Sequence, residues 1–439
     1  MAADVTSEPD ERPITDDPAR QLEWLRKRGR FDEFIQQALQ SADDANAKVS
    51  TRLLKVEALL AVGLVADAEL EAQHAANLAR EQRDFELLGL ALRRWATARS
   101  RQSKPLAGQW FDDALAQAAT NDATIELLRF WSSTLHERPP FAATIDGDRA
   151  AEIPSARTIS PQADQLNAIA ARVNGVELPA VYIDTGEQHV LLTREAAATA
   201  GVIIGAPAIR LSGFKSVAVS PGVIDTLELG AVTIHNVPVL VGDSAPLVQA
   251  QGQMSLGTEL MHHVRFTIDY PGRRVLAELS RAPRTADDAN EAWEIPLWTF
   301  SQICLAQGQM PGGALARVLV DTGNGAGSYV SVRWAHRHLP DFPRARGPII
   351  FKTKHRNLAL DKMDLGSQSL ADWPLADTLP LELERLDAVD VLVGHDLLGS
   401  FRLTIDMDRR QLRLVSVLPD RAAVDLQSPA TSSSGRNEN

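Results

Sequence analysis

The chain contains two carboxylates that each stand at the end of a strand-like run and beside a glycine turn. Asp184-Thr185-Gly186 follows the run 181–183, and Asp321-Thr322-Gly323 follows the run 318–320. Apolar, β-branched runs of this kind predict buried strands, and the glycines predict tight turns. One such carboxylate would carry little meaning, but two allow a pair. The members of a close pair share one proton, because two like charges cannot both ionise cheaply, so one can act as an acid and the other as a base.

The elements that must position these carboxylates are duplicated as well. The second tripeptide follows the first at an offset of 137, and each aspartate is followed at an offset of 73 by the glycine of an apolar-Gly signal, Leu256-Gly257 and Val393-Gly394. The segments 265–269 and 402–406 match at the same offset of 137. Self-similarity at a fixed offset is the sequence sign of duplicated structure. We therefore expect two copies of one fold.

Each copy has the pattern of a small β domain. Short apolar runs alternate with Gly, Pro, Asn and Asp turns over 164–280 and again over 292–417. Strands at such spacing predict an all-β sandwich or barrel. Each copy also predicts two short helices, and Thr193 and Ser331 are the expected N-caps of the helices that follow the Asp-Thr-Gly turns. The four predicted helices are 193–200, 259–262, 331–338 and 396–398.

Residues 18–136 predict helices, because Leu, Ile and Phe recur at helical spacing and strand-like alternation is absent. Gly29 and Gly63 each precede a segment that predicts the second helix of a hairpin. Their separation equals the period of tetratricopeptide repeats, which is about 34 residues. We therefore interpret this region as a short tetratricopeptide-like α-solenoid. Two roles stay open for it: a groove that binds a peptide or protein partner, and a helical cap that packs on the next domain.

Composition limits the classes of partner and site. The net charge of −12 and the pI of about 5.4 disfavour nucleic acid and an anionic membrane surface as main partners. Cys304 is the single cysteine, which excludes an intrachain disulfide, and its apolar neighbours predict a core position. The ten histidines lack zinc-type spacing with cysteine or acids, so no metal site is predicted.

The sequence also bears on the compartment. No segment approaches the roughly 20 apolar residues of a membrane helix. The start, 1–17, is acidic and contains proline, and it lacks the basic and apolar regions of a signal peptide. We therefore expect a cytoplasmic protein. The alternative is the periplasm, if a signal peptide has already been removed.

Together these patterns predict a multidomain α+β chain, with an N-terminal α-helical hairpin repeat followed by two all-β lobes. Stretches rich in proline or charge suit linkers on either side of the first lobe, and the polar ends suit disorder. The expected bounds are a disordered N-terminus over 1–17, the helical region over 18–136, a linker over 137–163, the first lobe over 164–280, a linker over 281–291, the second lobe over 292–417 and a disordered tail over 418–439.

The two Asp-Thr-Gly copies and the two later apolar-Gly signals give the segment 164–417 a family resemblance. It resembles the retropepsin-like aspartic proteases of bacteria, arranged as a tandem pair. The resemblance implies that each lobe is an acid-protease-like β-barrel and that a pseudo-twofold axis relates the lobes. It implies Asp184 and Asp321 as the catalytic dyad. It further implies that Thr185 and Thr322 brace the dyad, while Gly186 and Gly323 let the backbone approach the carboxylates.

The resemblance also implies a hairpin flap over the site. The flap candidates are Gly213 and Phe214 in the first lobe and Phe351 in the second. The family usually has Ala or Ser directly after Asp-Thr-Gly, whereas this chain has Glu187 and Asn324 there. A charged Glu187 close to the dyad would raise the pKa values of the aspartates. These departures leave open a lobe that keeps the fold with altered or lost activity.

The implied function is that of an aspartic endopeptidase, in which the dyad activates a water that hydrolyses peptide bonds of a polypeptide substrate. Such chemistry requires no metal and no organic cofactor. We expect a monomer with no nucleic-acid or membrane partner, and a protein partner would bind through the helical repeat. One alternative is a catalytically inactive protein that keeps the protease fold and binds a peptide or a partner. Another is a site that forms only between two molecules.

Overall fold

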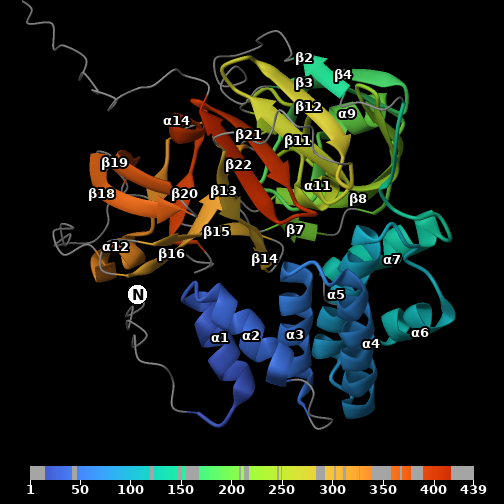
Figure 1. Cartoon of the computed structure of the whole chain (residues 1–439). Coiled ribbons are helices and arrows are strands. Elements are labelled where there is room, and N and C mark those ends of the chain that lie inside the picture. Colours follow the sequence, from blue (N-terminus) through green and yellow to red (C-terminus); the bar gives the residue numbers. More distant parts are fainter. Residues whose placement is uncertain are drawn as a thin grey trace, which may run out of the picture.

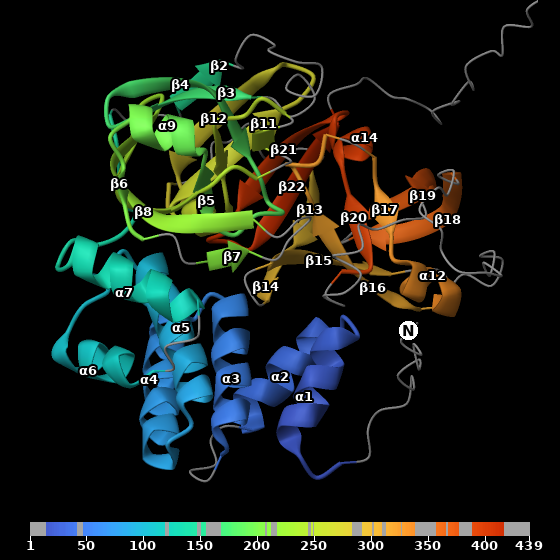
Figure 2. The ribbon, with the colours of Figure 1, turned by 180° about the vertical axis from the view of Figure 1, so that it is seen from behind.

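The computed structural model describes residues 15–41, 47–118, 123–146, 151–154, 168–206, 209–211, 217–244, 247–248, 250–282, 292–300, 303–309, 313–325, 327–338, 357–365, 368–376 and 389–416. In this part of the chain a helical region is followed by β-rich domains, so the predicted order of helices before strands is confirmed. Figure 1 shows the helices gathered on one side of the two lobes, and Figure 2 shows the same arrangement from behind.

The helical region is built of consecutive helices joined by short turns. Asp17 caps the first helix, because its side chain accepts a hydrogen bond from the Ala19 N–H at 3.2 Å. Gly29 and Gly63 have positive φ angles of 68° and 78° and lie between helices, as expected for hairpin turns. That the hairpins form a tetratricopeptide repeat stays a prediction. The helices are α1 (Pro18–Lys27), α2 (Phe31–Ser41), α3 (Val49–Ala61), α4 (Val65–Gln82), α5 (Phe85–Arg101), α6 (Gln109–Gln117) and α7 (Ala123–Leu135).

The first lobe contains a sheet that closes on itself. Its ring runs β8-β3-β4-β10-β5-β9, and β9 pairs with β8 to close it. β1, β6 and β7 pair with members of this ring. The elements of this lobe are β1 (Ala142–Ile145), β3 (Ile169–Val173), β4 (Val176–Ile183), β5 (Val190–Leu192), α9 (Arg194–Thr199), β6 (Ile203–Ile204), β7 (Ile209–Leu211), β8 (Val217–Leu229), β9 (Val232–Val241), β10 (Met254–Leu256) and α11 (Thr258–Met261).

The second lobe repeats this ring. Its order is β18-β15-β16-β20-β17-β19, again closed because β19 pairs with β18, and β14 pairs with β15. The same order of equivalent strands in both lobes agrees with the duplication in the sequence. The elements are β14 (Trp298–Phe300), β15 (Ile303–Gln309), β16 (Leu315–Val320), β17 (Tyr329–Val330), α12 (Val332–His338), β18 (Asn357–Leu365), β19 (Gln368–Ala376), β20 (Val391–Val393) and α14 (His395–Leu398).

The four short helices in the lobes lie where the sequence predicts them. Thr193 precedes α9, and its hydroxyl accepts a hydrogen bond from the Ala196 N–H at 3.3 Å. Ser331 precedes α12 and accepts from the Trp334 N–H at the same distance. Both predicted N-caps are therefore confirmed.

A third sheet joins the lobes, with the order β13-β22-β21-β11-β12-β2. At its centre the repeated segments pair with each other, and Thr267 lies opposite Thr404, its equivalent at an offset of 137. Their hydroxyls are 2.9 Å apart. The elements are β2 (Ala151–Pro154), β11 (Val264–Asp269), β12 (Arg274–Leu279), β13 (Trp293–Pro296), β21 (Phe401–Asp406) and β22 (Gln411–Ser416).

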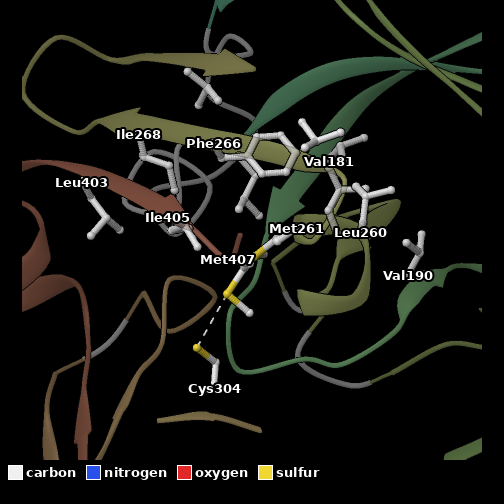
Figure 3. Packing of buried hydrophobic residues seen from close by; sticks show 14 of the residues in the cluster. Val181, Val190, Leu260, Met261, Phe266, Ile268, Cys304, Leu403, Ile405 and Met407 are labelled. Atoms are coloured by element: carbon white, nitrogen blue, oxygen red, sulfur yellow. Dashed lines mark hydrogen bonds between the residues drawn. The ribbon is translucent and has the colours of Figure 1, made fainter. Parts of the chain in front are cut away.

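The apolar side chains at this junction form part of one core. Figure 3 shows Phe266 and Ile268 of β11 near Leu403 and Ile405 of β21. Cys304 is buried here, as predicted, with its sulfur 3.8 Å from that of a methionine, Met407 (Figure 3). Because residues of both lobes share the core, the lobes are packed together as one unit.

The expected linker over 137–163 needs correction. Residues 142–145 form β1 on the first lobe, and residues 151–154 form β2 at the edge of the joining sheet. Pro154 ends an edge strand, where a missing N–H is tolerated, so proline did not exclude a strand here.

Several expected boundary segments fall wholly or mostly outside the described residues. Residues 1–14 of the expected N-terminal tail, 283–291 of the second linker and the tail 418–439 are among them. Within the described part, no helix has both the length and the apolar character that crossing a membrane requires.

Candidate active site

Each aspartate of the repeated tripeptide is held by the strand that carries the apolar-Gly signal. β10 runs parallel to β4, and the Asp184 N–H donates to the Leu256 carbonyl at 3.0 Å. β20 runs parallel to β16 in the same way, and the Asp321 N–H donates to the Val393 carbonyl at 2.9 Å. The glycine after each signal ends the strand before a short helix. The two sequence signals of each copy thus meet at one strand end.

The two threonines exchange equivalent hydrogen bonds between the copies. The Thr185 N–H donates to Thr322 Oγ1 at 3.1 Å, and the Thr322 N–H donates to Thr185 Oγ1 at 3.0 Å. The Thr322 hydroxyl donates to the Ile183 carbonyl at 2.8 Å, and the Thr185 hydroxyl donates to the Val320 carbonyl. Both threonines are buried, at 4% and 2% exposure. This closed set of bonds fastens the two strand ends to each other.

The two glycines bring the aspartates to one place. A Cβ added to Gly186 would clash with the Asp321 carboxyl, and one added to Gly323 would clash with the Asp184 carboxyl. Each glycine therefore lies against the aspartate of the other copy. Any side chain at these positions would push the carboxyls apart, so the close approach depends on glycine.

The carboxyl groups of Asp184 and Asp321 lie within hydrogen-bonding reach of each other. The Gly186 N–H donates to Asp184 Oδ1 at 2.9 Å, and the Gly323 N–H donates to Asp321 Oδ1 at 3.0 Å. Ser255 adds a hydroxyl 3.5 Å from Asp184 Oδ2. In the second copy the position that matches Ser255 holds a leucine, so the surroundings of the two acids differ.

The pKa values of both acids are raised, but by different balances of causes. Burial, followed by the charge of Asp184, raises the pKa of Asp321 well above its ordinary value. Burial also raises the pKa of Asp184, but donors from Gly186, Asp321 and Ser255 oppose that rise. The rise in pKa is thus opposed by more donors at Asp184 than at Asp321, and two acids this close titrate as a pair.

Glu187 is a third carboxyl group beside the pair. Its side chain is partly buried, and burial together with the charge of Asp184 raises its pKa to about 7. It is therefore neutral below that pH and adds a negative charge next to Asp184 above it. Asn324 occupies the matching position in the second copy, where its side-chain amide donates to the Gly327 carbonyl at 2.9 Å. Asn324 thus braces its own turn without adding charge.

An acidic residue in each short helix after the apolar-Gly strands holds the loop that follows the aspartate. Glu259 of α11 accepts from Gln188 Nε2 at 2.7 Å and contacts His189 Nδ1 at 3.0 Å. Asp396 of α14, its match at an offset of 137, accepts from the Ser328 hydroxyl at 2.6 Å and from the Ser328 N–H at 3.0 Å. The sequence places both acids in a first helical turn but does not predict these loop contacts. Their shared offset of 137 was the available signal.

His189 links this loop to the helical region. Burial would lower the pKa of His189, but the Glu259 carboxylate outweighs burial and raises it. The ring of Trp131 in α7 lies 5.8 Å from the His189 ring, and its Nε1–H donates to the Gly222 carbonyl at 3.0 Å. A helix outside the β lobes therefore contacts the loop next to Asp184, which no pattern in the sequence predicts.

The remaining predicted site residues are the flap candidates. The flap candidates Gly213, Phe214 and Phe351 lie outside the described residues. Within the residues that are described, no group of three or more His, Cys, Asp or Glu side chains could hold a metal ion. The polar groups described around the carboxyl pair are the Gly186 and Gly323 N–H donors, the Ser255 hydroxyl and the Glu187 carboxyl.

Comparison with known proteins gives similar structures and one family match. The crystal structure of an aspartic proteinase from Irpex lacteus shares 13% identity, covers 61% of this chain and 97% of its own, and has a TM-score of 0.39. A retropepsin-like aspartic protease from Rickettsia conorii shares 20% identity, covers 30% of this chain and 95% of its own, and has a TM-score of 0.21. At TM-scores this low the likeness supports no statement about function. A search of curated proteins found no match. Residues 169–260, which include the first Asp-Thr-Gly and Leu256-Gly257, match a family model described as aspartyl protease, so this part of the chain is similar to that family.

Proposed function

We propose that this chain is an aspartic endopeptidase whose dyad, Asp184 and Asp321, lies between two lobes related by a pseudo-twofold axis. The single observation that carries the proposal is the closed exchange of hydrogen bonds between Thr185 and Thr322, which brings the carboxyls within reach of each other. The family match over the first lobe supports the same reaction class. The pairing of Thr267 with Thr404 supports the symmetry of the lobes.

The roles follow from the different surroundings of the two acids. In the first step the Asp184 carboxylate takes a proton from a water, and the water oxygen attacks the carbonyl carbon of a peptide bond. Asp321 gives its proton to the carbonyl oxygen, so the intermediate is a neutral gem-diol. In the second step one hydroxyl of the gem-diol returns its proton to Asp321. The carbon–nitrogen bond breaks, and the leaving amine takes the proton held by Asp184.

The substrate of this reaction is a polypeptide in extended conformation. A peptide carbonyl can reach the dyad only where the backbone is open, and Gly186 is exposed to solvent beside Asp184. Extended peptides bind well along strand edges, because their backbone groups then find partners. Both acids belong to one chain, which favours a monomeric enzyme. A protein partner for the helical repeat stays a prediction.

Cleavage of an unfolded, fluorescently labelled polypeptide from pH 3 to pH 8 tests the proposal. Asp184→Asn and Asp321→Asn each keep the size of the side chain but remove one proton-transfer group, so each should lower the rate by at least about 10²–10⁴-fold. Asp225→Asn is the matched control, because Asp225 is exposed and paired with Arg138 at the surface. It should leave the rate unchanged. Cleavage that persists in both dyad variants would refute the assignment.

Two further outcomes separate the alternatives. A mixture of the Asp184→Asn and Asp321→Asn proteins should stay inactive, whereas restored cleavage would show that the site forms between two molecules. Wild-type protein that binds the polypeptide without cleaving it would favour the inactive binding protein.

A further inference from the structure

A cavity of about 310 Å³ lies where the helical region meets both β lobes, away from the aspartate pair. The turn between α3 and α4 and the end of α5 form one side of it. The first lobe contributes His262 and Arg281, and the second lobe contributes Thr299 and Arg410. Arg101, the last residue of α5, also lines the cavity. A molecule bound here would contact all three parts of the chain.

Arg101 is a half-buried cation with a buried Nε and without a paired anion. Among the described residues it forms no salt bridge, its Nε has no hydrogen-bond partner, and its Nη1 donates to the neutral Leu60 carbonyl at 3.2 Å. Burial lowers its pKa to about 10. Glu259 favours the charged form from a distance, but Gln188 and His189 already occupy the oxygens of that carboxylate. Such a charge is costly to bury unless an anion compensates it.

His262 adds a second polar group without a partner to the lining of this cavity. Its Nε2 is buried and has no hydrogen-bond partner within the described part of the chain. Burial, with the charge of Arg101, lowers its pKa well below the ordinary value, so the ring is neutral at neutral pH. A neutral imidazole beside a guanidinium can donate one hydrogen bond to an anion.

The other charges of the cavity favour an anion over a cation. Arg410 is half-buried and brings a second guanidinium group, whereas that of Arg281 is exposed. Asp67 and Asp408 also line the cavity, but both residues are exposed, so water and salt screen their charges. The local excess of cations stands out in a chain with a net charge of −12. Guanidinium groups match the planar or tetrahedral oxygens of carboxylates and phosphates.

We propose that this cavity binds a small oxyanion, a phosphate- or carboxylate-bearing molecule, through Arg101, Arg410 and His262. A volume of about 310 Å³ exceeds that of an inorganic ion and lies at the lower end of the range of small-molecule sites. Bound there, the oxyanion compensates Arg101 and ties the helical region to both lobes. A ligand that binds only the folded chain stabilises it in proportion to the logarithm of its concentration.

Thermal unfolding and titration calorimetry of the full chain test this site, with inorganic phosphate, sulfate and citrate as probes and sodium chloride holding the ionic strength constant. We expect the unfolding temperature to rise with the logarithm of the probe concentration above its Kd, and the heat of binding in calorimetry to saturate. A stronger effect of phosphate or of citrate tells which oxyanion source the cavity prefers. Kosmotropic anions also stabilise proteins that have no binding site for them. Saturation of the heat of binding and the variants below therefore decide whether a specific site exists.

Arg410→Gln should weaken binding of the preferred probe about tenfold, because it removes one charge-assisted contact. Arg410→Lys keeps the charge but loses the fork, so its affinity should lie between those of the wild type and Arg410→Gln. Arg138→Gln removes the same charge from an exposed pair and should bind like the wild type. Arg101→Gln should abolish binding. If the Arg101→Gln protein does not fold, the affinity of Arg410→Gln still tests the proposal. A heat of binding that does not saturate, or equal affinity in wild type and Arg410→Gln, would overturn the proposal.

Discussion

Thr322→Val replaces a buried hydroxyl by a methyl group and should destabilise the junction of the two lobes. In the native chain this hydroxyl accepts from the Thr185 N–H at 3.1 Å and donates to the Ile183 carbonyl at 2.8 Å. Valine has nearly the same shape, so packing changes little while both bonds are lost. Each buried polar group left without a partner costs about 1–3 kcal/mol, and partial relaxation brings the expected loss to about 2–4 kcal/mol.

Thr322→Ser separates the hydrogen bonds from the packing. Serine keeps the hydroxyl and loses one methyl group, so the expected loss is only about 1 kcal/mol. Thr185→Val should behave like Thr322→Val, because Thr185 makes the equivalent bonds to the Thr322 N–H and the Val320 carbonyl. The two hydroxyl oxygens are 3.3 Å apart and belong to one network, so the double variant should lose less stability than the sum of the single losses.

Urea unfolding followed by tryptophan fluorescence measures these differences. All variants carry Asp184→Asn in addition, so that proteolysis does not distort the transition. Shifts of the midpoint at constant slope report the change in the free energy of unfolding. A Thr322→Val midpoint that matches that of Thr322→Ser would show that the exchanged hydrogen bonds do not hold the lobes together. The proposed dyad would then lose its main support.

Three further predictions concern titratable groups. Glu187→Gln should move the alkaline limb of the pH–rate profile to lower pH and leave the acid limb unchanged. The reason is that Glu187 is charged only above about pH 7, and that charge helps the dyad keep its proton. An unchanged alkaline limb would contradict this prediction. Asp321→Asn should raise the unfolding temperature at pH 7, because folding raises the pKa of Asp321 and such an acid lowers stability above its unfolded pKa. An unfolding temperature below that of the wild type would argue against a raised pKa of Asp321 in the folded chain. Burial lowers the pKa of His263 to about 4, so between about pH 6.5 and pH 4 the unfolded chain binds a proton that the folded chain does not, and stability falls as the pH drops. At pH 5 the expected loss relative to pH 7 is about 2 kcal/mol. In urea unfolding, the stability of His263→Gln should depend on pH with a slope smaller by up to one proton.

Much of the candidate site is visible in the sequence because it depends on repeated local signals. The run before each Asp-Thr-Gly predicts the strand, the glycine predicts the turn, and the offset of 137 predicts which distant residues are equivalent. Thr193 and Ser331 are N-caps because their residue type suits a helix start, whatever the rest of the chain does. Cys304 is buried because its neighbours are apolar.

Other parts could not be predicted, because their cause lies far away in the chain. β1 is a strand because Ala142 to Ile145 pair with residues 232–235 of β9, and its two alanines carry no strand preference. Ser255 acts on Asp184 only through the parallel pairing of β10 with β4. Trp131 meets His189 only because α7 packs against the first lobe. Tertiary contacts of this kind leave no local pattern.

The apolar runs before the two aspartates also explain what the helical region does. In β4, Val181 and Ile183 face the core of the lobes, whereas Tyr182 between them packs with the helices of the N-terminal region. In β16, Leu319 likewise packs with those helices, between neighbours that face the other way.

A strand covered by a β core on one face and by helices on the other must be apolar on both faces, and both runs are. The aromatic contact of Phe31 in α2 with Phe300 in β14, at 4.6 Å between ring centres, shows the same continuity at the second lobe. Of the two roles open for the helical region, packing on the lobes therefore accounts for its buried face. A protein partner could therefore bind only to the faces of the helices that are turned away from the lobes. Without the helices, the backs of both aspartate strands would be exposed to water, so we expect loss of the helices to disturb the aspartate pair although they contribute no residue to it.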